Sequence, residues 1–350
     1  MSRDRAARVA LLAAALLALV TGAAGGLSRL GAGWSLPVAA ATHGALMVAG
    51  FLGTVISLER AVALGGRWAL SAPIASALGT VLVLFGWPTA GALLWLAAPV
   101  LLLAVSIAIV KRQAELHTVL LALAAVAWLA GNALHSFGGA AGAPAWWFTF
   151  LVLTIAAERL EMTRLMKRRR GATPALLALI ALLVAGAAGS GVAFGAALSG
   201  IAAWLALFDL ARRTVRGEGF ARYAAVALLG GYAWLAAGGV AWALMASGHG
   251  GLRDAAMHAV GLGFVLSMIL AHAPIVVPVI ARLRMRYVPF FYVPLALLHL
   301  SLLLRLGAGF GDAALRLWGG ALNAAAIVLF AATVAGSLSI PGRPSADVAK

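Results

Sequence analysis

Two histidines lie inside one long apolar segment in the C-terminal third of the chain. His258 and His272 belong to residues 254–282, which read DAAMHAVGLGFVLSMILAHAPIVVPVIAR. An imidazole at membrane depth is energetically costly, so it marks a candidate functional site. In a regular α-helix, the intervening residues would rise about 21 Å and turn to within about 40° of the same face. The segment therefore predicts one imidazole near each side of a bilayer.

Further histidines are expected in the same layer as His258. By helical rise, His43 lies about 9 Å and His258 about 6 Å into their apolar segments, and His135 and His299 lie close to the ends of two others. Neutral imidazole suits haem iron, copper and zinc. The matching depth favours cofactor ligation for His43 and His258. For His299, ligation and a hydrogen bond to a backbone carbonyl or serine remain equal alternatives, and for His135 the hydrogen bond is favoured.

His272 and Met47 complete the set of candidate ligands. Pro274 and Pro278 each remove a backbone hydrogen bond, so they predict a loosened helix around His272. Met47 follows His43 by one helical turn and can share its face. Histidine and methionine together bind Cu(I) or complete a haem, although methionine in an apolar helix more often serves packing.

Carboxylates and arginines alternate at two other positions in the chain. Glu59-Arg60 ends one apolar segment, and Glu158-Arg159-Leu160-Glu161 lies within another. Charge inside a membrane is tolerated when acid and base are paired, so we expect these acids to pair with Arg60, Arg159 or Arg164. Structural ion pairs are the favoured role, and a proton path is the alternative. The repeated Glu-Arg hints at three four-helix repeats.

The composition indicates a membrane protein. Of 350 residues, 64% are hydrophobic and 10% are charged, which no soluble domain of this length resembles. The absence of cysteine excludes disulfides, thiolate metal sites and c-type haem attachment. The net charge of +16 is explained by membrane orientation and not by nucleic acid, because the charges lie between apolar spans. No phosphate-binding, zinc-protease or dinucleotide-binding motif occurs.

We predict an all-α, polytopic bundle of about twelve transmembrane helices in a single domain, residues 1–340, followed by a disordered cytoplasmic tail, residues 341–350. The Gly-rich stretch 186–195 is expected to form a tight turn between two spans. The predicted spans are 8–26, 37–64, 69–86, 89–110, 116–137, 143–166, 172–188, 191–210, 223–247, 254–281, 288–306 and 312–337.

The basic residues predict the orientation. They concentrate in every second loop, and four of the 26 fall on the other side: Arg29, Arg253, Arg305 and Arg316. The positive-inside rule then places both termini in the cytoplasm, in an inner (plasma) membrane. A cleaved signal peptide is the alternative for the first apolar run, which is however long for one.

Two of these segments resemble the NnrS-like membrane proteins. The segment HAVGLGFVLSMILAHAPIVVPVIAR is similar to their helix with two histidines separated by Gly and Met, and THGALMVAGFLG is similar to their earlier histidine helix. The resemblance implies haem and copper, and a link to nitric oxide, nitrosative stress and denitrification. Proline after His272 departs from the usual glycine-centred turn.

A wider similarity is to the catalytic subunit of haem–copper oxidases. That fold has twelve helices in three arcs, and histidines on helices two and ten hold its low-spin haem, as His43 and His258 would here. Its copper-site histidines lie on helices six and seven, and spans six and seven of this chain contain none. Oxygen or nitric oxide reduction at a binuclear centre is therefore not expected.

The leading interpretation is an integral membrane protein that binds haem b or copper through His43 and His258. It would act in electron transfer, with a redox partner protein, or in handling nitric oxide. The alternative is a proton-coupled transporter or channel whose path is lined by the same histidines and by Glu158. A third interpretation is a structural membrane subunit without a cofactor.

Overall fold

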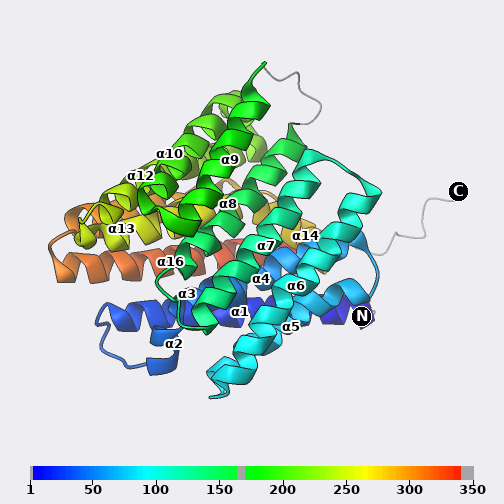
Figure 1. The fold of residues 1–350 in the computed structure, drawn as a ribbon, viewed down its shortest axis with the longest axis horizontal. Helices are drawn as coiled ribbons and strands as arrows, with labels where there is room; N and C mark the ends of the chain where they lie inside the picture. The colour runs from blue at the N-terminus through cyan, green and yellow to red at the C-terminus, as the bar shows by residue number, and fades with distance from the viewer. Residues whose placement is uncertain (1–2, 164–169, 340–350) are drawn as a thin grey trace, which may run out of the picture.

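The computed structural model describes residues 3–163 and 170–339, which form helices and one short pair of strands (Figure 1). The α-helices are α1 (Arg3–Arg29), α2 (Pro37–Ala41), α3 (His43–Ala45), α4 (Gly53–Leu64), α5 (Ser71–Leu84), α6 (Pro88–Arg112), α7 (Leu116–Ser136), α8 (Ala143–Met162), α9 (Ala172–Gly189), α10 (Gly191–Phe208), α11 (Ala211–Thr214), α12 (Gly219–Ala246), α13 (Arg253–His258), α14 (Ser267–Ala281), α15 (Tyr292–Leu303) and α16 (Ala313–Ser337).

Shorter helical segments extend or link these helices. Three are π-helical, η1 (Leu46–Leu52), η4 (Ala259–Leu266) and η6 (Leu304–Ala308), and three are 3₁₀ turns, η2 (Trp68–Leu70), η3 (Gly250–Leu252) and η5 (Pro289–Phe291). The strands β1 (Arg284–Met285) and β2 (Leu338–Ser339) pair antiparallel and bring the segment after α14 to the end of α16.

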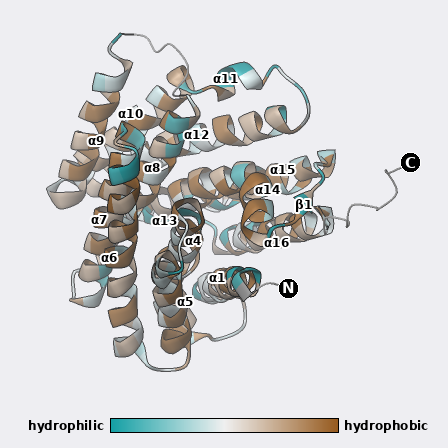
Figure 2. Cartoon of the chain, turned by 90° about the vertical axis from the view of Figure 1, so that its right-hand side faces the viewer, coloured by the Kyte–Doolittle hydropathy of each residue, from teal (hydrophilic) through white to brown (hydrophobic). Residues whose placement is uncertain are grey.

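The all-α, multi-pass architecture is confirmed. Within the described residues, ten helices are long and apolar enough to cross a membrane: Asp4–Arg29, His43–Leu64, Pro88–Arg112, Leu116–Ser136, Ala172–Gly189, Gly191–Phe208, Gly219–Ala246, Gly250–Ala281, Pro289–Ala308 and Ala313–Ser337. Figure 2 shows the corresponding brown, apolar helix bodies. Hydrophilic residues, in teal, occur in the short connecting helix α11 and at the start of α1.

Two of the twelve predicted spans are not among these ten. The apolar helix Trp68–Leu84 is short, and α8 carries Glu158, Arg159 and Glu161 near its end. α8 is nevertheless the most enclosed helix, because every residue from Trp147 to Ala157 is buried. A helix that is buried all round belongs in the interior of a bundle. Residues 164–166 of this predicted span, and the predicted tail 341–350, lie outside the described residues.

Neighbours along the chain pack side by side through most of the bundle. The largest contacts are α7 with α8, α10 with α12, α5 with α6, α6 with α7, and α9 with α10. The predicted turn in 186–195 is confirmed: α9 ends at Gly189, and Ser190 caps α10 by accepting a hydrogen bond from the Ala193 amide at 3.3 Å.

The first and last long helices close the bundle. α1 packs against η1 and contacts both α14 and α16. α1 begins, and α16 ends, on the same side of the molecule (Figure 1). The spans that carry His43 and His258 are therefore far apart in sequence, yet both contact α1.

The helix around His272 continues through its prolines, and the loosening expected there stays a prediction. α14 runs unbroken from Ser267 to Ala281 through Pro274 and Pro278, and it ends at Arg282, which has a positive φ of 52°. The irregular stretch is η4, which directly follows His258. Because a π-helix turns less per residue than an α-helix, the regular-helix estimate of the relative faces of His258 and His272 does not hold.

Candidate functional site

His43 and His258 form a pair of adjacent imidazoles, which we call the histidine pair. Their ring centroids are 6.2 Å apart, and the ring planes differ by 27°. His43 lies on α3 and His258 ends α13, and a π-helical segment follows each closely. Single-turn π-helical insertions occur frequently at functional sites. The expected proximity of these two histidines is therefore present, whereas ligation by them stays a prediction.

A backbone carbonyl orients the His43 ring. Its Nδ1 lies 2.6 Å from the carbonyl oxygen of Gly22 on α1. Since a carbonyl can only accept, Nδ1 carries the proton in the neutral ring and Nε2 keeps its lone pair. Gly26 makes room for the ring, because a Cβ there would lie 2.9 Å from Cε1 of His43. Within the described residues, Nε2 of His43 has no hydrogen-bond partner.

A carboxylate orients the His258 ring. Nδ1 of His258 lies 2.9 Å from Oδ1 of Asp254, one helical turn earlier, and 3.1 Å from the Asp254 carbonyl oxygen. Histidines that ligate metals generally donate the second ring N–H to a carboxylate or a carbonyl, which fixes the tautomer. Both members of the histidine pair have such an acceptor at Nδ1.

Arg305 joins Asp254 and His258 from a third helix. Its Nη2 donates to Oδ1 of Asp254 at 2.8 Å and its Nε to Oδ2 at 3.1 Å, while Nη2 lies 3.3 and 3.2 Å from the two ring nitrogens of His258. Arg305 lies in the π-helical segment η6 and is buried, with 8% of its surface exposed. The sequence reasoning missed Asp254 and treated Arg305 as a loop charge. The Asp254–His258 spacing of one helical turn was the available signal.

The nitrogen donors of the histidine pair are of the kind that binds a transition-metal ion. Two imidazoles suit copper or haem iron, and Nε2 is the free nitrogen of both rings once Nδ1 is occupied. The two rings are stacked with centroids 6.2 Å apart, which brings both imidazoles close to one place, and a metal–nitrogen bond is about 2 Å long. Arg305 Nη2 competes for the same lone pair of His258, so an ion bound there requires the guanidinium to turn toward Asp254.

Met47 lies on the α1-facing side of the same span. Its sulfur is 2.9 Å from where a Cβ on Gly22 would be, and Gly22 also supplies the carbonyl for His43. A thioether is a soft ligand for Cu(I). Among the described residues, no group of three or more His, Cys, Asp or Glu side chains could hold a metal. A site here would therefore consist of the two imidazoles, with Met47, one helical turn after His43, as the predicted third ligand.

The glycines near the histidine pair are used for packing. A Cβ on Gly53 would lie 2.2 Å from a ring carbon of Trp128, and one on Gly263 would lie 2.4 Å from the Trp234 ring. Gly50 faces the Thr80 side chain in the same way, at 2.7 Å. A Cβ on Gly261, in contrast, would meet only the Phe148 ring, at 3.7 Å.

His299 and His135 are not part of the histidine pair. Nδ1 of His299 accepts a hydrogen bond from the Trp234 indole at 2.9 Å, and its buried Nε2 lies against Gly230 on α12. The His135 ring lies 5.3 Å from that of Trp147. Of the four imidazoles predicted to share one layer, His43 and His258 thus form a pair, and His135 and His299 each contact a tryptophan instead.

A second polar region, the arginine–carboxylate cluster, consists of Glu59, Arg60, Glu158, Arg159 and Asp209. Nη2 of Arg60 donates to Glu59 at 2.9 Å and to Glu158 at 3.0 Å, which joins α4 to α8. Arg159 pairs with Asp209 at 3.2 Å, and their side chains are 6% and 1% exposed. The expected partners are thus found for Glu59 and Glu158, whereas Arg159 binds Asp209 at the end of α10.

His272 and Glu161 lie at the edge of this cluster. Nδ1 of His272 is 2.6 Å from the Met268 carbonyl oxygen, and the ring is within electrostatic range of Glu59 and Arg159. Glu161 is within the same range of Arg60. Arg164, the other predicted partner, lies outside the described residues. His258 and His272 therefore belong to different polar regions of one span.

These features define a multi-pass α-helical membrane protein with two polar regions, one built on imidazoles and one on ion pairs. The chain belongs to the family described as a domain of unknown function, DUF8744, which matches residues 8–339. No curated protein matches the chain, and no solved structure does.

Proposed function

We propose that the protein binds a redox-active metal, as copper or haem iron, through His43 and His258. The observation that carries the proposal is the histidine pair itself, with ring centroids 6.2 Å apart and an oxygen acceptor at each Nδ1. Two partly buried imidazoles, each oriented by an oxygen acceptor within an apolar bundle, are expensive to place in a membrane protein. Their remaining nitrogens have the right chemistry for a transition metal.

The surrounding residues would set the properties of that site. The Gly22 carbonyl and Asp254 hold the two rings in one tautomer, which leaves Nε2 of His43 available, whereas Nε2 of His258 lies 3.2 Å from Nη2 of Arg305. Arg305 places a positive charge beside His258, and Asp254 compensates for it. A bound copper ion or haem would supply one-electron transfer and binding of small diatomic molecules.

Electron transfer and nitric oxide handling are the two roles that fit this chemistry. The resemblance to NnrS-like proteins favours nitric oxide or nitrosative stress, and electron transfer would require a redox partner protein.

The test is the metal content and the absorbance of the purified protein. Protein from cells supplied with copper and with haem should carry about one equivalent of one of them, and His43→Ala and His258→Ala should each remove it. His249→Ala is the matched control, since His249 is exposed and lies outside the pair. Protein that carries neither copper nor haem would overturn the proposal.

We further propose that both termini face the cytoplasm of an inner (plasma) membrane. The support is the alternation of Lys/Arg-rich loops together with the common side of the α1 start and the α16 end (Figure 1). Reporter fusions after residues 170 and 250 should report opposite sides of the membrane. Equal signals from both fusions would contradict this topology.

A proton-coupled transporter or channel is the second candidate, and the arginine–carboxylate cluster favours it. Ionisable residues inside a bundle commonly mark proton or ion paths. His272 lies near Glu59, Arg159 and Asp209, so the cluster contains groups able to exchange protons. In proteoliposomes with an imposed pH gradient, a Glu158-dependent proton flux would support this function, and flux equal to that of empty vesicles would exclude it.

A further inference from the structure

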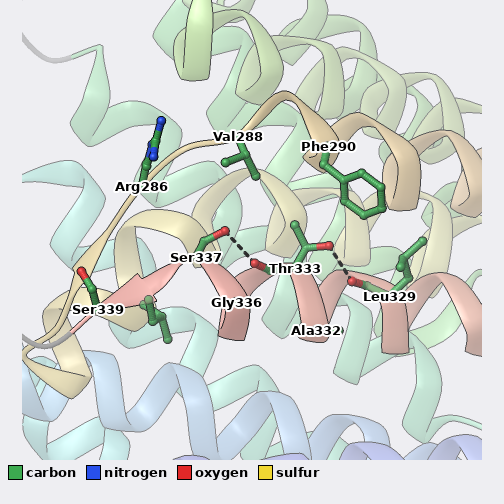
Figure 3. A pocket seen from close by; sticks show the side chains of 10 residues that line it. Arg286, Val288, Phe290, Leu329, Ala332, Thr333, Gly336, Ser337 and Ser339 are labelled. Atoms are coloured by element: carbon green, nitrogen blue, oxygen red, sulfur yellow. Dashed lines mark hydrogen bonds between the residues drawn. The ribbon is translucent and has the colours of Figure 1, made fainter.

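A pocket of about 600 Å³ lies between the segment that follows β1 and the last turns of α16. In Figure 3, Arg286 and Phe290 lie at opposite ends of the pocket, with Thr333 and Ser337 of α16 between them. The β1–β2 pair closes one side, since the Arg286 amide donates to the Ser337 carbonyl at 3.0 Å. We call it the Arg286 pocket.

The polar end of the pocket has a cationic residue, Arg286. Two further exposed arginines, Arg282 and Arg284, precede it in the same short segment outside the pocket lining. In the part of the chain that the structure describes, none of the three has an acidic partner. Ser339 at the same end is exposed and offers a hydroxyl donor. Thr333 and Ser337 already donate to helix carbonyls, so their hydroxyls can only accept.

The other end of the pocket is apolar. Phe290, half exposed, faces Leu329 and Ala332 of α16. The pocket lies where two membrane-spanning helices end, at Pro289 and at Ser337. It is therefore placed at the boundary between the apolar and the polar layer of a bilayer, with its cationic end on the polar side.

We propose that the Arg286 pocket binds an anionic phospholipid. Arg286 and Ser339 would contact the phosphate headgroup, and the first part of an acyl chain would lie beside Phe290 and Leu329. Basic pockets between transmembrane helices recognise anionic headgroups in this way. A soluble phosphate would leave the apolar half of the pocket without a role. The proposal does not depend on the metal site, because the pocket shares no residue with the histidine pair.

The full-length protein is first delipidated in detergent, and each test lipid is then added back. Native mass spectrometry measures how much of the added lipid the protein retains. Dioleoyl-phosphatidylglycerol should be retained about fivefold more strongly than dioleoyl-phosphatidylcholine, since one arginine near the headgroup contributes about 1 kcal/mol. Arg286→Gln should abolish this preference. Arg222→Gln is the matched control, because Arg222 is exposed outside the pocket and loses the same charge. Equal retention of the two lipids by the unaltered protein would overturn the proposal.

A second variant tests the shape of the pocket without changing its charge. Gly336 lines the pocket, and a Cβ on it would meet no atom within 4 Å, so Gly336→Leu fills the cavity without a clash. We expect Gly336→Leu to lower phosphatidylglycerol retention while the thermal transition stays unchanged. Full retention in this variant, or displacement of the lipid by millimolar glycerol phosphate, would show that the site does not hold a phospholipid.

Discussion

The histidine pair and the arginine–carboxylate cluster lie toward opposite ends of the span that contains His43 and Arg60, and they use their polar atoms differently. In the cluster, Arg60 meets two carboxylates, and Arg159 meets Asp209. In the pair, each ring uses Nδ1 for orientation, and Nε2 of His43 is left without a protein partner in the described residues.

This difference separates a structural role from a binding role. Charges that neutralise one another inside a bundle stabilise the helix contacts they bridge, and removal of one partner leaves an uncompensated charge. A ring that is held at one nitrogen and free at the other is available to a ligand. We therefore assign ligand binding to the histidine pair and stability to the cluster, and the following experiments test this assignment in order of decreasing effect.

The largest effect is expected for the metal content of His258→Ala. Loss of one of two imidazoles should remove the bound metal almost entirely, from about one equivalent to nearly none, because the remaining ligands are too few. Metal analysis of the purified variant measures this, alongside its thermal stability. A variant that keeps its metal would move the binding site away from the histidine pair.

Arg159→Met should cause the largest loss of stability. The substitution leaves the Asp209 carboxylate, 1% exposed, without its cation, and such a loss costs about 3–5 kcal/mol in the free energy of unfolding. Denaturation of the purified protein in detergent measures it, with Arg213→Met as the control on an exposed arginine. If both variants were equally stable, the Arg159–Asp209 pair would not be structural. The metal content per folded molecule should stay unchanged.

Asp254→Asn should weaken metal binding without removing it. The carboxylate orients His258 through Nδ1, and loss of such a partner typically lowers metal affinity about 10- to 100-fold. Competition with a chelator measures the affinity, and Glu218→Gln, an exposed acid elsewhere, is the control. An affinity equal to that of the control would show that Asp254 serves only its pair with Arg305.

Glu158→Gln should have the smallest effect. Its side chain is 22% exposed, and Arg60 keeps its contact with Glu59, so we expect a loss of about 1 kcal/mol in stability. The absorbance spectrum and metal content should not change. Normal stability together with loss of a proton flux would instead favour the transporter alternative.

Local sequence signals anticipated the elements that carry both regions. Apolar runs between basic loops indicated the helices, the glycines near Ser190 indicated the turn between α9 and α10, and matching depth indicated that His43 and His258 could meet. The prolines after His272 did not mark the end of a helix, because α14 continues through both. Contacts with neighbouring helices let a membrane helix continue through a proline, and these contacts are not encoded in the spacing of the prolines.

The sequence by itself determined the class of this protein, because apolar length and charge alternation depend only on the order of residues along each helix. The tertiary structure alone decided which polar groups meet. Asp254 and Arg305 are 51 residues apart, and Gly22 is 21 residues from His43, yet these groups orient the histidine pair. Such contacts depend on how the helices pack around α1 and on the π-helical segments that turn each histidine, and no periodicity in the sequence specifies either.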